Sequence, residues 1–243
     1  MNKRIHFARI LLFWLIAKPF VALVLGTRIH GIKKLPAKGP AILVANHNSH
    51  LDTLVLMTLF PTRLLPVLRP VAAADYFTRS RWLRAFALHI VRIIPITRTP
   101  STSHPHPLTP CLDALDRGEI LIVFPEGSRG EPEARGHFKN GIAHLAKSRP
   151  QVPVHPICLS GTGRALPKGE ALFVPHVCRL AIGNPVPWTG DKADFMQDLE
   201  HRFDQLNRLI APAPFPAHPN LESAPRQPET GRTTAKAKNL HNT

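Results

Sequence analysis

The sequence predicts an α/β fold, with a mixed central sheet flanked by helices and a helical hairpin at the N-terminus. Short apolar runs of strand length, such as Ala41–Ala45 and residues 119–124, alternate with longer segments in which apolar residues recur at helical spacing. The 243 residues suffice for one substantial domain, and their hydrophobic fraction of 44% can build its core. A third observation sets the N-terminus apart, because its two apolar runs are bracketed by basic residues.

The N-terminal apolar runs, residues 10–17 and 20–25, are separated by Lys18 and Pro19. A helix over both would be about 24 Å long, short of the roughly 30 Å hydrocarbon core of a bilayer. Basic residues flank the runs on both sides and therefore give no orientation for a crossing. We expect residues 1–30 to form a membrane-docking helical hairpin that dips into one leaflet. A cleavable signal peptide and a single membrane span are the alternatives.

The charge of the chain is concentrated in its first half. Residues 1–112 carry 15 Lys and Arg residues against two acidic residues, Asp52 and Asp75. Such a surface favours a polyanionic partner, either nucleic acid or an anionic membrane. The basic residues are not interleaved with exposed aromatics and form no recognisable reading module, so we expect membrane lipids as partners and no nucleic acid. The predicted location is the cytoplasmic face of the cytoplasmic membrane, as a peripheral or monotopic protein.

The remaining elements follow in order through a predicted domain of residues 31–211. The expected strands are Ala41–Ala45 and residues 67–74, 91–96, 119–124, 171–174 and 178–182. The expected helices are residues 53–60, 76–89, 111–117 and 191–209, with Gly118 ending the third of them. Residues 212–243 are Pro-rich and then polar, and we expect a disordered tail.

Cysteine and histidine spacing gives no metal site. Cys111, Cys158 and Cys178 are odd in number, widely spaced and match no zinc pattern, so we expect reduced, mostly buried thiols in a cytoplasmic compartment. His104 and His106 stand in a Pro-rich loop without an acidic partner, whereas metal ligands come as three or four.

The strand Ala41–Ala45 leads into a candidate catalytic pair, His47 and Asp52. Five residues apart, they would not share one face of a continuous helix. They can meet if His47 lies in the turn and Asp52 at the start of the following helix. A carboxylate on one imidazole nitrogen then fixes the tautomer and leaves the other nitrogen free to take a proton from a hydroxyl. His50 is a local competitor for this role.

Five sequence blocks, in order, resemble the glycerolipid acyltransferase family that includes bacterial 1-acylglycerol-3-phosphate acyltransferases. Residues 46–52 resemble its NHxxxxD block, residues 94–98 its arginine-ended second block, and residues 124–129 its FPEGTR block. Residues 138–141 resemble the F-K-x-G step, and residues 152–157 the proline-flanked fourth block.

The resemblance implies an O-acyltransferase that moves an acyl group from acyl-CoA or acyl carrier protein to the sn-2 hydroxyl of 1-acylglycerol-3-phosphate. The product would be phosphatidic acid, a phospholipid precursor, and no cofactor or metal is implied. The implied residues are His47 and Asp52 in catalysis, and Arg98, Glu126, Gly127, Arg129 and Lys139 in substrate binding. Arginine offers phosphate a planar fork, and lysine adds a point charge.

Departures from the family pattern bear on the acceptor. Arg92 stands where the second block usually has glycine, Ser128 replaces a threonine, and Gly130 stands where serine is common. The alternative is therefore the same chemistry on another lyso-lipid, such as a lyso-amino-acid lipid or a lysophospholipid. A non-catalytic basic membrane or nucleic-acid binder is a remote alternative, because the His47 and Asp52 pair is intact.

Overall fold

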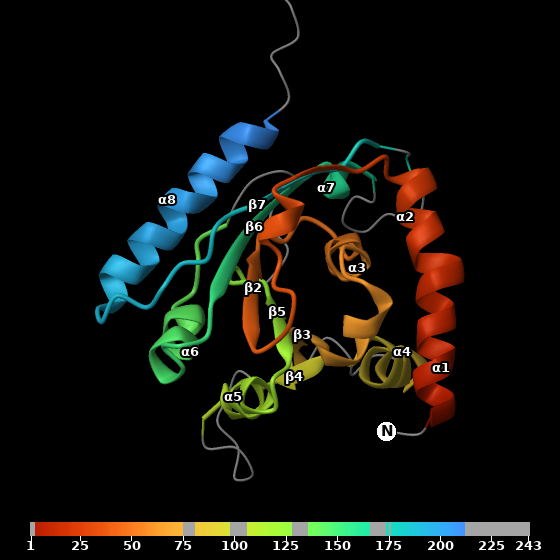
Figure 1. Cartoon of the computed structure of the whole chain (residues 1–243), viewed down its shortest axis with the longest axis horizontal. Coiled ribbons are helices and arrows are strands. Elements are labelled where there is room, and N and C mark those ends of the chain that lie inside the picture. Colours follow the sequence, from red (N-terminus) through yellow and green to blue (C-terminus); the bar gives the residue numbers. More distant parts are fainter. Residues whose placement is uncertain are drawn as a thin grey trace, which may run out of the picture. The chain divides into compact units, whose positions relative to one another are not determined.

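The described strands form one mixed seven-stranded sheet in the order β1-β7-β6-β2-β5-β3-β4 (Figure 1). Neighbouring strands run parallel except β6 and β7, which are antiparallel. This confirms the predicted α/β class. The strands are β1 Arg28–His30, β2 Ala41–Ala45, β3 Leu68–Ala73, β4 Ile94–Ile96, β5 Ile120–Val123, β6 Val154–Ser160 and β7 Arg179–Ile182.

The computed structural model describes residues 3–74, 81–97, 106–127, 136–165, 174 and 176–211. Met1–Ala211 forms one compact unit. The predicted disordered tail and most of the predicted strand 171–174 lie outside the described residues.

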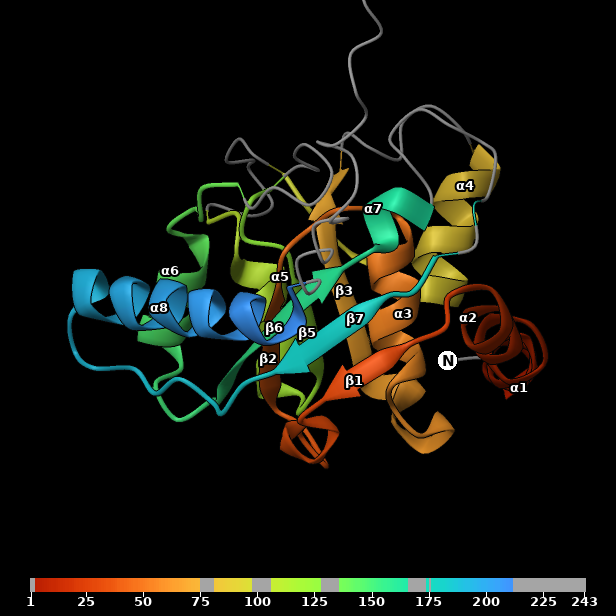
Figure 2. The ribbon, with the colours of Figure 1, turned by 90° about the horizontal axis from the view of Figure 1, so that it is seen from above.

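Helices cover both faces of the sheet (Figures 1 and 2). On one face lie α3 and the N-terminal helical run, and on the other lie α5, α6 and α8. The helical elements that cover the two faces are α1 Lys3–Leu12, the π turn η1 Phe13–Ala17, α2 Lys18–Val24, α3 Leu51–Thr58, α5 Thr109–Asp116, α6 Gly141–Ser148 and α8 Lys192–Ile210. The shorter ones are η2 Ile32–Lys34, η3 Thr62–Val67, α4 Arg81–Phe86, η5 Ala87–Val91 and α7 Thr162–Ala165.

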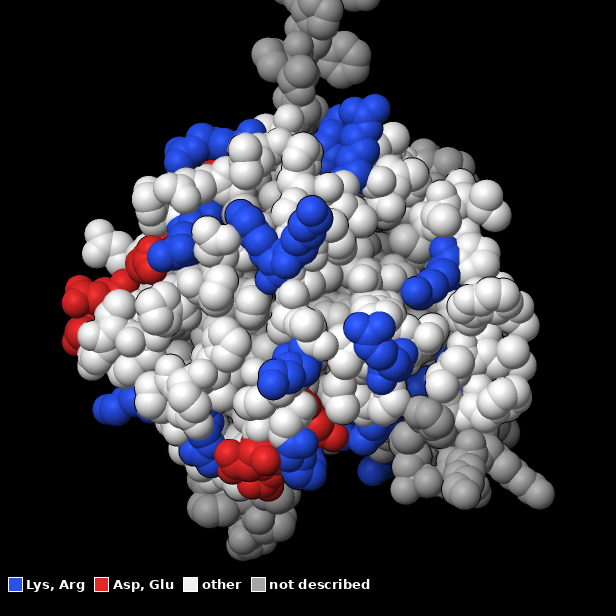
Figure 3. Space-filling model, viewed as in Figure 1, with Lys and Arg blue, Asp and Glu red and all other residues white. Residues whose placement is uncertain are grey.

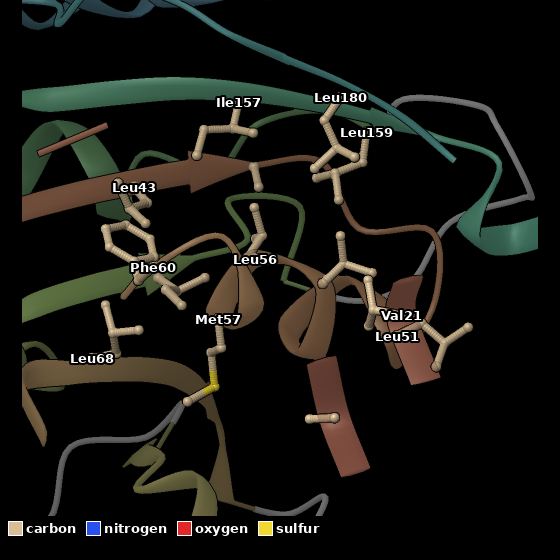
Figure 4. Packing of buried hydrophobic residues seen from close by; sticks show 14 of the residues in the cluster. Val21, Leu43, Leu51, Leu56, Met57, Phe60, Leu68, Ile157, Leu159 and Leu180 are labelled. Carbon is tan, nitrogen blue, oxygen red and sulfur yellow. The ribbon is translucent and has the colours of Figure 1, made fainter. Parts of the chain in front are cut away.

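Strand alternation divides the core into two layers. In β2, Leu43 packs into the layer with α3, whereas Ile42 and Val44 pack into the layer with α5, α6 and α8. Figure 4 shows Leu56 of α3 pointing toward the sheet. Since all five residues of β2 are buried, as expected for a central strand, the loop after β2 starts from a rigid position.

The N-terminus differs from the predicted hairpin. Residues from Lys3 to Val24 form one helical run, because the linking residues Leu12, Ala17 and Lys18 all have right-handed helical backbone angles. The N–H of Lys18 bonds the carbonyl of Phe13, the five-residue spacing of a π turn. This wider turn accommodates Pro19, which would otherwise clash with the preceding helical turn. Within the described residues, no helix combines the length and apolar character needed to cross a bilayer.

Other elements differ at their ends. β1 was not predicted, because its three residues are exposed and only their parallel pairing with β7 makes them a strand. Residues 91–96 contain a strand only from Ile94, since Val91 ends a π turn and Arg92 takes a left-handed φ of 63°. The predicted helix 76–89 is described from Arg81. The three cysteines are free and buried, as expected.

Candidate active site

The candidate site lies at the carboxyl ends of the inner strands β2, β5 and β6. We call this end of the sheet its carboxyl edge, and the opposite end its amino edge. Because β2 pairs in parallel with both β5 and β6, the carboxyl ends of the three strands reach one edge. His47 follows β2 by two residues, and Glu126 follows β5 by three. Residues 79 apart in the sequence are thereby brought into contact.

The predicted pair forms. Nδ1 of His47 lies 3.0 Å from Oδ2 of Asp52, and the Asp52 side chain is fully buried while 17% of the His47 side chain is exposed. α3 begins at Leu51, two residues earlier than predicted, which places Asp52 in its first turn. His50 is exposed and occupies the position before the helix. The histidine that contacts the Asp52 carboxylate is therefore His47, as predicted.

Backbone donors hold the Asp52 carboxylate in place. Its Oδ2 accepts the N–H of Asn48 at 2.6 Å and of Ser49 at 2.7 Å, in addition to the imidazole. Within the described residues, Oδ1 is buried without a hydrogen-bond partner. A carboxylate at a helix start with two backbone donors stays oriented, and it keeps the proton of His47 on Nδ1.

Two asparagines bind the loop between β2 and α3 to β6. The Asn46 amide bonds both backbone groups of Leu159, donating to the carbonyl at 2.8 Å and accepting from the N–H at 2.7 Å. The Asn48 amide donates to the same carbonyl at 3.0 Å. Asn46 therefore extends the pairing of β2 with β6 by one side chain. Asn46 had no predicted role of its own, although an amide directly after a strand that is expected to be buried was a usable signal.

The side chain of Glu126 contacts the backbone of the loop between β2 and α3. Oε1 of Glu126 accepts the N–H of His47 at 3.1 Å, and the residue is only 6% exposed. Burial raises the pKa of this carboxyl, while the backbone N–H groups of His47 and Gly136 oppose the rise. Glu126 is thus a positioning residue for His47 as well as a predicted acceptor contact, and the first of these roles was not foreseen.

Phe124 supports the imidazole from the β5 side. The two rings stack with their centroids 4.1 Å apart and an angle of 21° between their planes. Stacking and the bond to Asp52 together fix the ring, and Nε2 has no hydrogen-bond partner within the described residues. The free nitrogen can therefore take a proton from a hydroxyl that approaches this edge.

The predicted phosphate contacts are only partly described. Gly127 has a φ of 71°, and a Cβ at that position would lie 2.6 Å from Nζ of Lys139. The missing side chain therefore lets the lysine ammonium lie directly over the backbone after Glu126. The other two predicted contacts, Arg98 and Arg129, lie outside the described residues. No group of metal-ligating side chains occurs among the residues that the structure describes.

An imidazole held by a buried carboxylate, with its second nitrogen left free by the described residues, has the geometry that general-base catalysis requires. A sequence model of the Acyltransferase family matches residues 26–160, a stretch that holds His47, Asp52, Glu126 and Lys139. The chain belongs to this family.

Relatives with assigned names agree with the family. Over 174 residues the chain is 30% identical to the chloroplastic 1-acyl-sn-glycerol-3-phosphate acyltransferase of Brassica napus, covering 71% of this chain and 48% of the relative. It is also 30% identical to 1-acyl-sn-glycerol-3-phosphate acyltransferase alpha of Bos taurus, covering 72% of this chain and 58% of the relative. The chain thus spans about half the length of these relatives.

The fold has a solved counterpart. The crystal structure of the 1-acyl-sn-glycerophosphate acyltransferase PlsC from Thermotoga maritima matches with a TM-score of 0.66. The match covers 87% of this chain and 85% of the other, at 22% sequence identity.

Proposed function

We propose that this protein transfers a fatty acyl group from acyl-CoA or acyl carrier protein to the sn-2 hydroxyl of 1-acylglycerol-3-phosphate. The product is phosphatidic acid. The observation that carries this proposal is the 3.0 Å contact between Nδ1 of His47 and the buried Oδ2 of Asp52, which leaves Nε2 as the nitrogen available to a substrate hydroxyl. Membership of the Acyltransferase family and the names of the relatives support the substrate class.

The proposed reaction needs no covalent enzyme intermediate. Nε2 of His47 takes the proton of the sn-2 hydroxyl while that oxygen attacks the thioester carbonyl carbon. Asp52 stabilises the imidazolium that forms. The tetrahedral intermediate expels the thiolate, which receives the proton from His47. The thiolate is a good leaving group, so we propose that no metal or further cofactor takes part.

The acceptor phosphate is assigned to basic side chains of the segments that follow β4 and β5 in the sequence. We propose that Lys139 binds it together with Arg98 and Arg129, and that Glu126 and Gly127 complete the acceptor site. Support comes from the ammonium of Lys139, which lies over Gly127 and thus beside the loop that holds His47. Arginine forks and a lysine point charge together suit a phosphate monoester.

An acyl-transfer assay tests the proposal. Labelled acyl-CoA and 1-acylglycerol-3-phosphate are supplied in detergent micelles to the parent, His47→Ala and Arg98→Ala proteins. We expect His47→Ala to lose about 10²–10⁴-fold in rate, the usual contribution of a general base. Arg98→Ala should lose the preference for this acceptor over a monoacylglycerol, which lacks the phosphate. If the His47→Ala protein kept the activity of the parent, the assignment of His47 as the general base would be refuted.

The second candidate function, transfer to another lyso-lipid, was motivated by Arg92. In the structure Arg92 precedes β4, and its guanidinium donates to the carbonyl of Pro66 and lies 3.5 Å from Glu119, which precedes β5. Arg92 therefore lies at the end of the sheet where β4 and β5 begin, whereas His47 lies where β2 ends, so the structure gives no support to Arg92 as a contact of the acceptor. Thioester cleavage that depends on His47 without transfer to 1-acylglycerol-3-phosphate would still favour another acceptor.

We propose that the protein associates peripherally with a membrane, on its cytoplasmic face. Several large apolar side chains of the N-terminal helical run are exposed, although a different stripe of the same run is buried. The exposed ones are Phe7, Leu11, Trp14, Leu15, Ile16 and Leu23. Lys and Arg also spread over the face shown in Figure 3, whereas Asp and Glu gather at one end of α8 and at the lower edge. Apolar anchors beside a basic surface suit an anionic bilayer.

A further inference from the structure

A second group of charged side chains lies at the amino edge of the sheet, where β3, β4 and β5 begin. Its centre is Glu119, whose carboxylate oxygens form ion pairs with three guanidinium groups. The nitrogen–oxygen distances are 3.0 Å for Arg69, 3.1 Å for Arg117 and 3.5 Å for Arg92. Nε of Arg69 also donates to the main-chain carbonyl of Arg92 at 2.9 Å, which ties the Arg69 side chain to the backbone before β4. We call these residues, together with Arg9, the amino-edge cluster.

Arg9 occupies a position where the helix should carry an apolar side chain. The buried stripe of the N-terminal helical run continues every four residues, through Phe13, Ala17, Val21 and Leu25. Arg9 is the next member of this stripe and is 1% exposed. Its Nη2 makes one long bond, 3.4 Å, to the carbonyl of Val91. Its Nε and Nη1 are buried without any hydrogen-bond partner in the described part of the chain.

The cluster is short of negative charge. Among the described residues, three guanidinium groups share the Glu119 carboxylate, and Arg9 has no contact with it. The charged neighbours that act on Arg9 are Arg92 and Arg69. Burial, and then these two cations, lower the pKa of Arg9 to about 10. Burial and Arg69 also lower the pKa of Arg92, against the opposing effect of Glu119. A purely structural ion-pair network would balance its charges, because an unpaired buried cation destabilises the fold.

Backbone strain at Arg92 gives further support. Its φ of 63° is left-handed, where a residue with a Cβ is disfavoured and glycine is not. An arginine is nevertheless present, and its side chain is directed into the cluster by Pro66 and Glu119. The strained backbone thus positions a guanidinium beside Arg69.

We propose that the amino-edge cluster binds a phosphate group, at a site separate from the acyl-transfer centre. Planar guanidinium groups match phosphate oxygens in pairs, and the one or two negative charges of a phosphate would offset part of the excess positive charge of the four arginines. The unpartnered Nε and Nη1 of Arg9 supply donors for it. Arg117, with 56% of its side chain exposed, leaves the cluster open to solvent on one side. The phosphate can belong to a lipid headgroup or be free, and the two sources are distinguished below.

Thermal unfolding in detergent micelles tests the site without any measurement of activity. Inorganic phosphate should raise the Tm of the parent protein, whereas sodium chloride at the same ionic strength should not. Arg92→Gly and Arg117→Ala should each weaken the apparent affinity for phosphate at least tenfold. Both variants should fold, since glycine suits the φ of residue 92 and residue 117 is exposed. Arg149→Ala is the matched control, because Arg149 pairs with Asp116 outside the cluster.

Several results would overturn the site. One is the absence of a phosphate-specific rise in the Tm of the parent protein. Another is a rise of equal affinity in the parent, Arg92→Gly and Arg117→Ala proteins. A rise that is lost in Lys139→Ala and kept in Arg92→Gly would place the phosphate at the carboxyl edge instead. Arg9→Met adds a direct test of the buried donors, and in a folded variant it should weaken phosphate binding to the same extent.

Vesicle flotation identifies the source of the phosphate. Vesicles of phosphatidylcholine alone are compared with vesicles that also contain phosphatidic acid. A lipid ligand predicts that Arg92→Gly and Arg117→Ala lose the preference for phosphatidic acid and still float with phosphatidylcholine. An unchanged preference, together with a lost phosphate effect on Tm, means that the cluster takes a soluble phosphate.

Discussion

Replacing Asp52 with asparagine tests the central contact of the site. The amide keeps the shape of the carboxylate, and its oxygen can still accept the N–H groups of Asn48 and Ser49, which lie 2.6 and 2.7 Å from Oδ2. The substitution therefore removes the charge that faces His47 while it preserves the loop. We expect a large loss of acyl transfer with a modest loss of stability.

The expected loss of rate follows from the geometry. At 3.0 Å, with an effective dielectric constant of about 20, the imidazolium of His47 and the Asp52 carboxylate interact by about 5.5 kcal/mol. Each 1.36 kcal/mol is about tenfold in rate, so full loss corresponds to about 10⁴-fold. The amide dipole retains part of this interaction, and we expect a fall of about 10³–10⁴-fold in kcat.

Stability separates this catalytic role from a structural one. Bonds to a neutral amide are weaker than bonds to a carboxylate, and we expect Asp52→Asn to lose about 2 kcal/mol. For a unit of this size, such a loss lowers Tm by roughly 4–8 °C. Acyl transfer is measured on protein shown to be folded at the assay temperature. Asp198→Asn on α8 is the matched control, since it removes a partly exposed ion pair with Arg202 and should change neither property measurably.

Activity of Asp52→Asn within tenfold of the parent would contradict this reasoning. It would mean that the carboxylate serves the loop and not the imidazolium. A loss of activity that tracks the loss of folded protein would lead to the same conclusion.

Three further substitutions test the support around the pair. Asn46→Ala removes both bonds to Leu159, and chemical denaturation should show a loss of about 1–3 kcal/mol in the free energy of unfolding. Activity should also fall because the loop loosens, and an unchanged denaturation midpoint would contradict this. Glu126→Gln removes a carboxyl whose pKa is raised by burial. The parent should therefore lose stability relative to the variant as the pH rises above the ordinary pKa of a glutamate, and parallel Tm profiles of the two proteins would count against this. Gly127→Ala places a Cβ on a residue with left-handed backbone angles and against the Lys139 side chain. The KM for a phosphate-bearing acceptor should therefore rise, and an unaltered KM would show that Lys139 does not bind the acceptor phosphate.

Local patterns in the sequence predicted the parts of the fold that local forces decide. β2 is an apolar run and was located at its observed ends, because burial on both faces leaves a continuous apolar signature. α8 was predicted within one residue at each end, since Asp191 caps it through the N–H groups of Ala193 and Asp194. β1 has no such signal, because its exposed residues depend on β7, about 150 residues later.

The N-terminal run shows how a correct local observation gave a wrong structure. Lys18 and Pro19 do interrupt regular α-helical bonding, as predicted. The interruption is a π turn and not a reversal, because the buried stripe that includes Phe13 and Val21 continues across it against α3. Tertiary packing therefore decides between a bend and a hairpin, and no window of the sequence contains that information.

Sequence reasoning located His47 and Asp52 because their contact is set within one turn. The partnership of His47 with Glu126 required knowledge of which strands are neighbours. Parallel pairing aligns Val44 of β2 with Val123 of β5, so the residues that follow each strand emerge at one edge. Once the sheet order is fixed, the backbone N–H of His47 and a carboxylate 79 residues away meet at 3.1 Å without further adjustment. The site thus depends on the central place of β2, and a change that displaced β2 from β5 would separate His47 from Glu126 while leaving both sequence blocks intact.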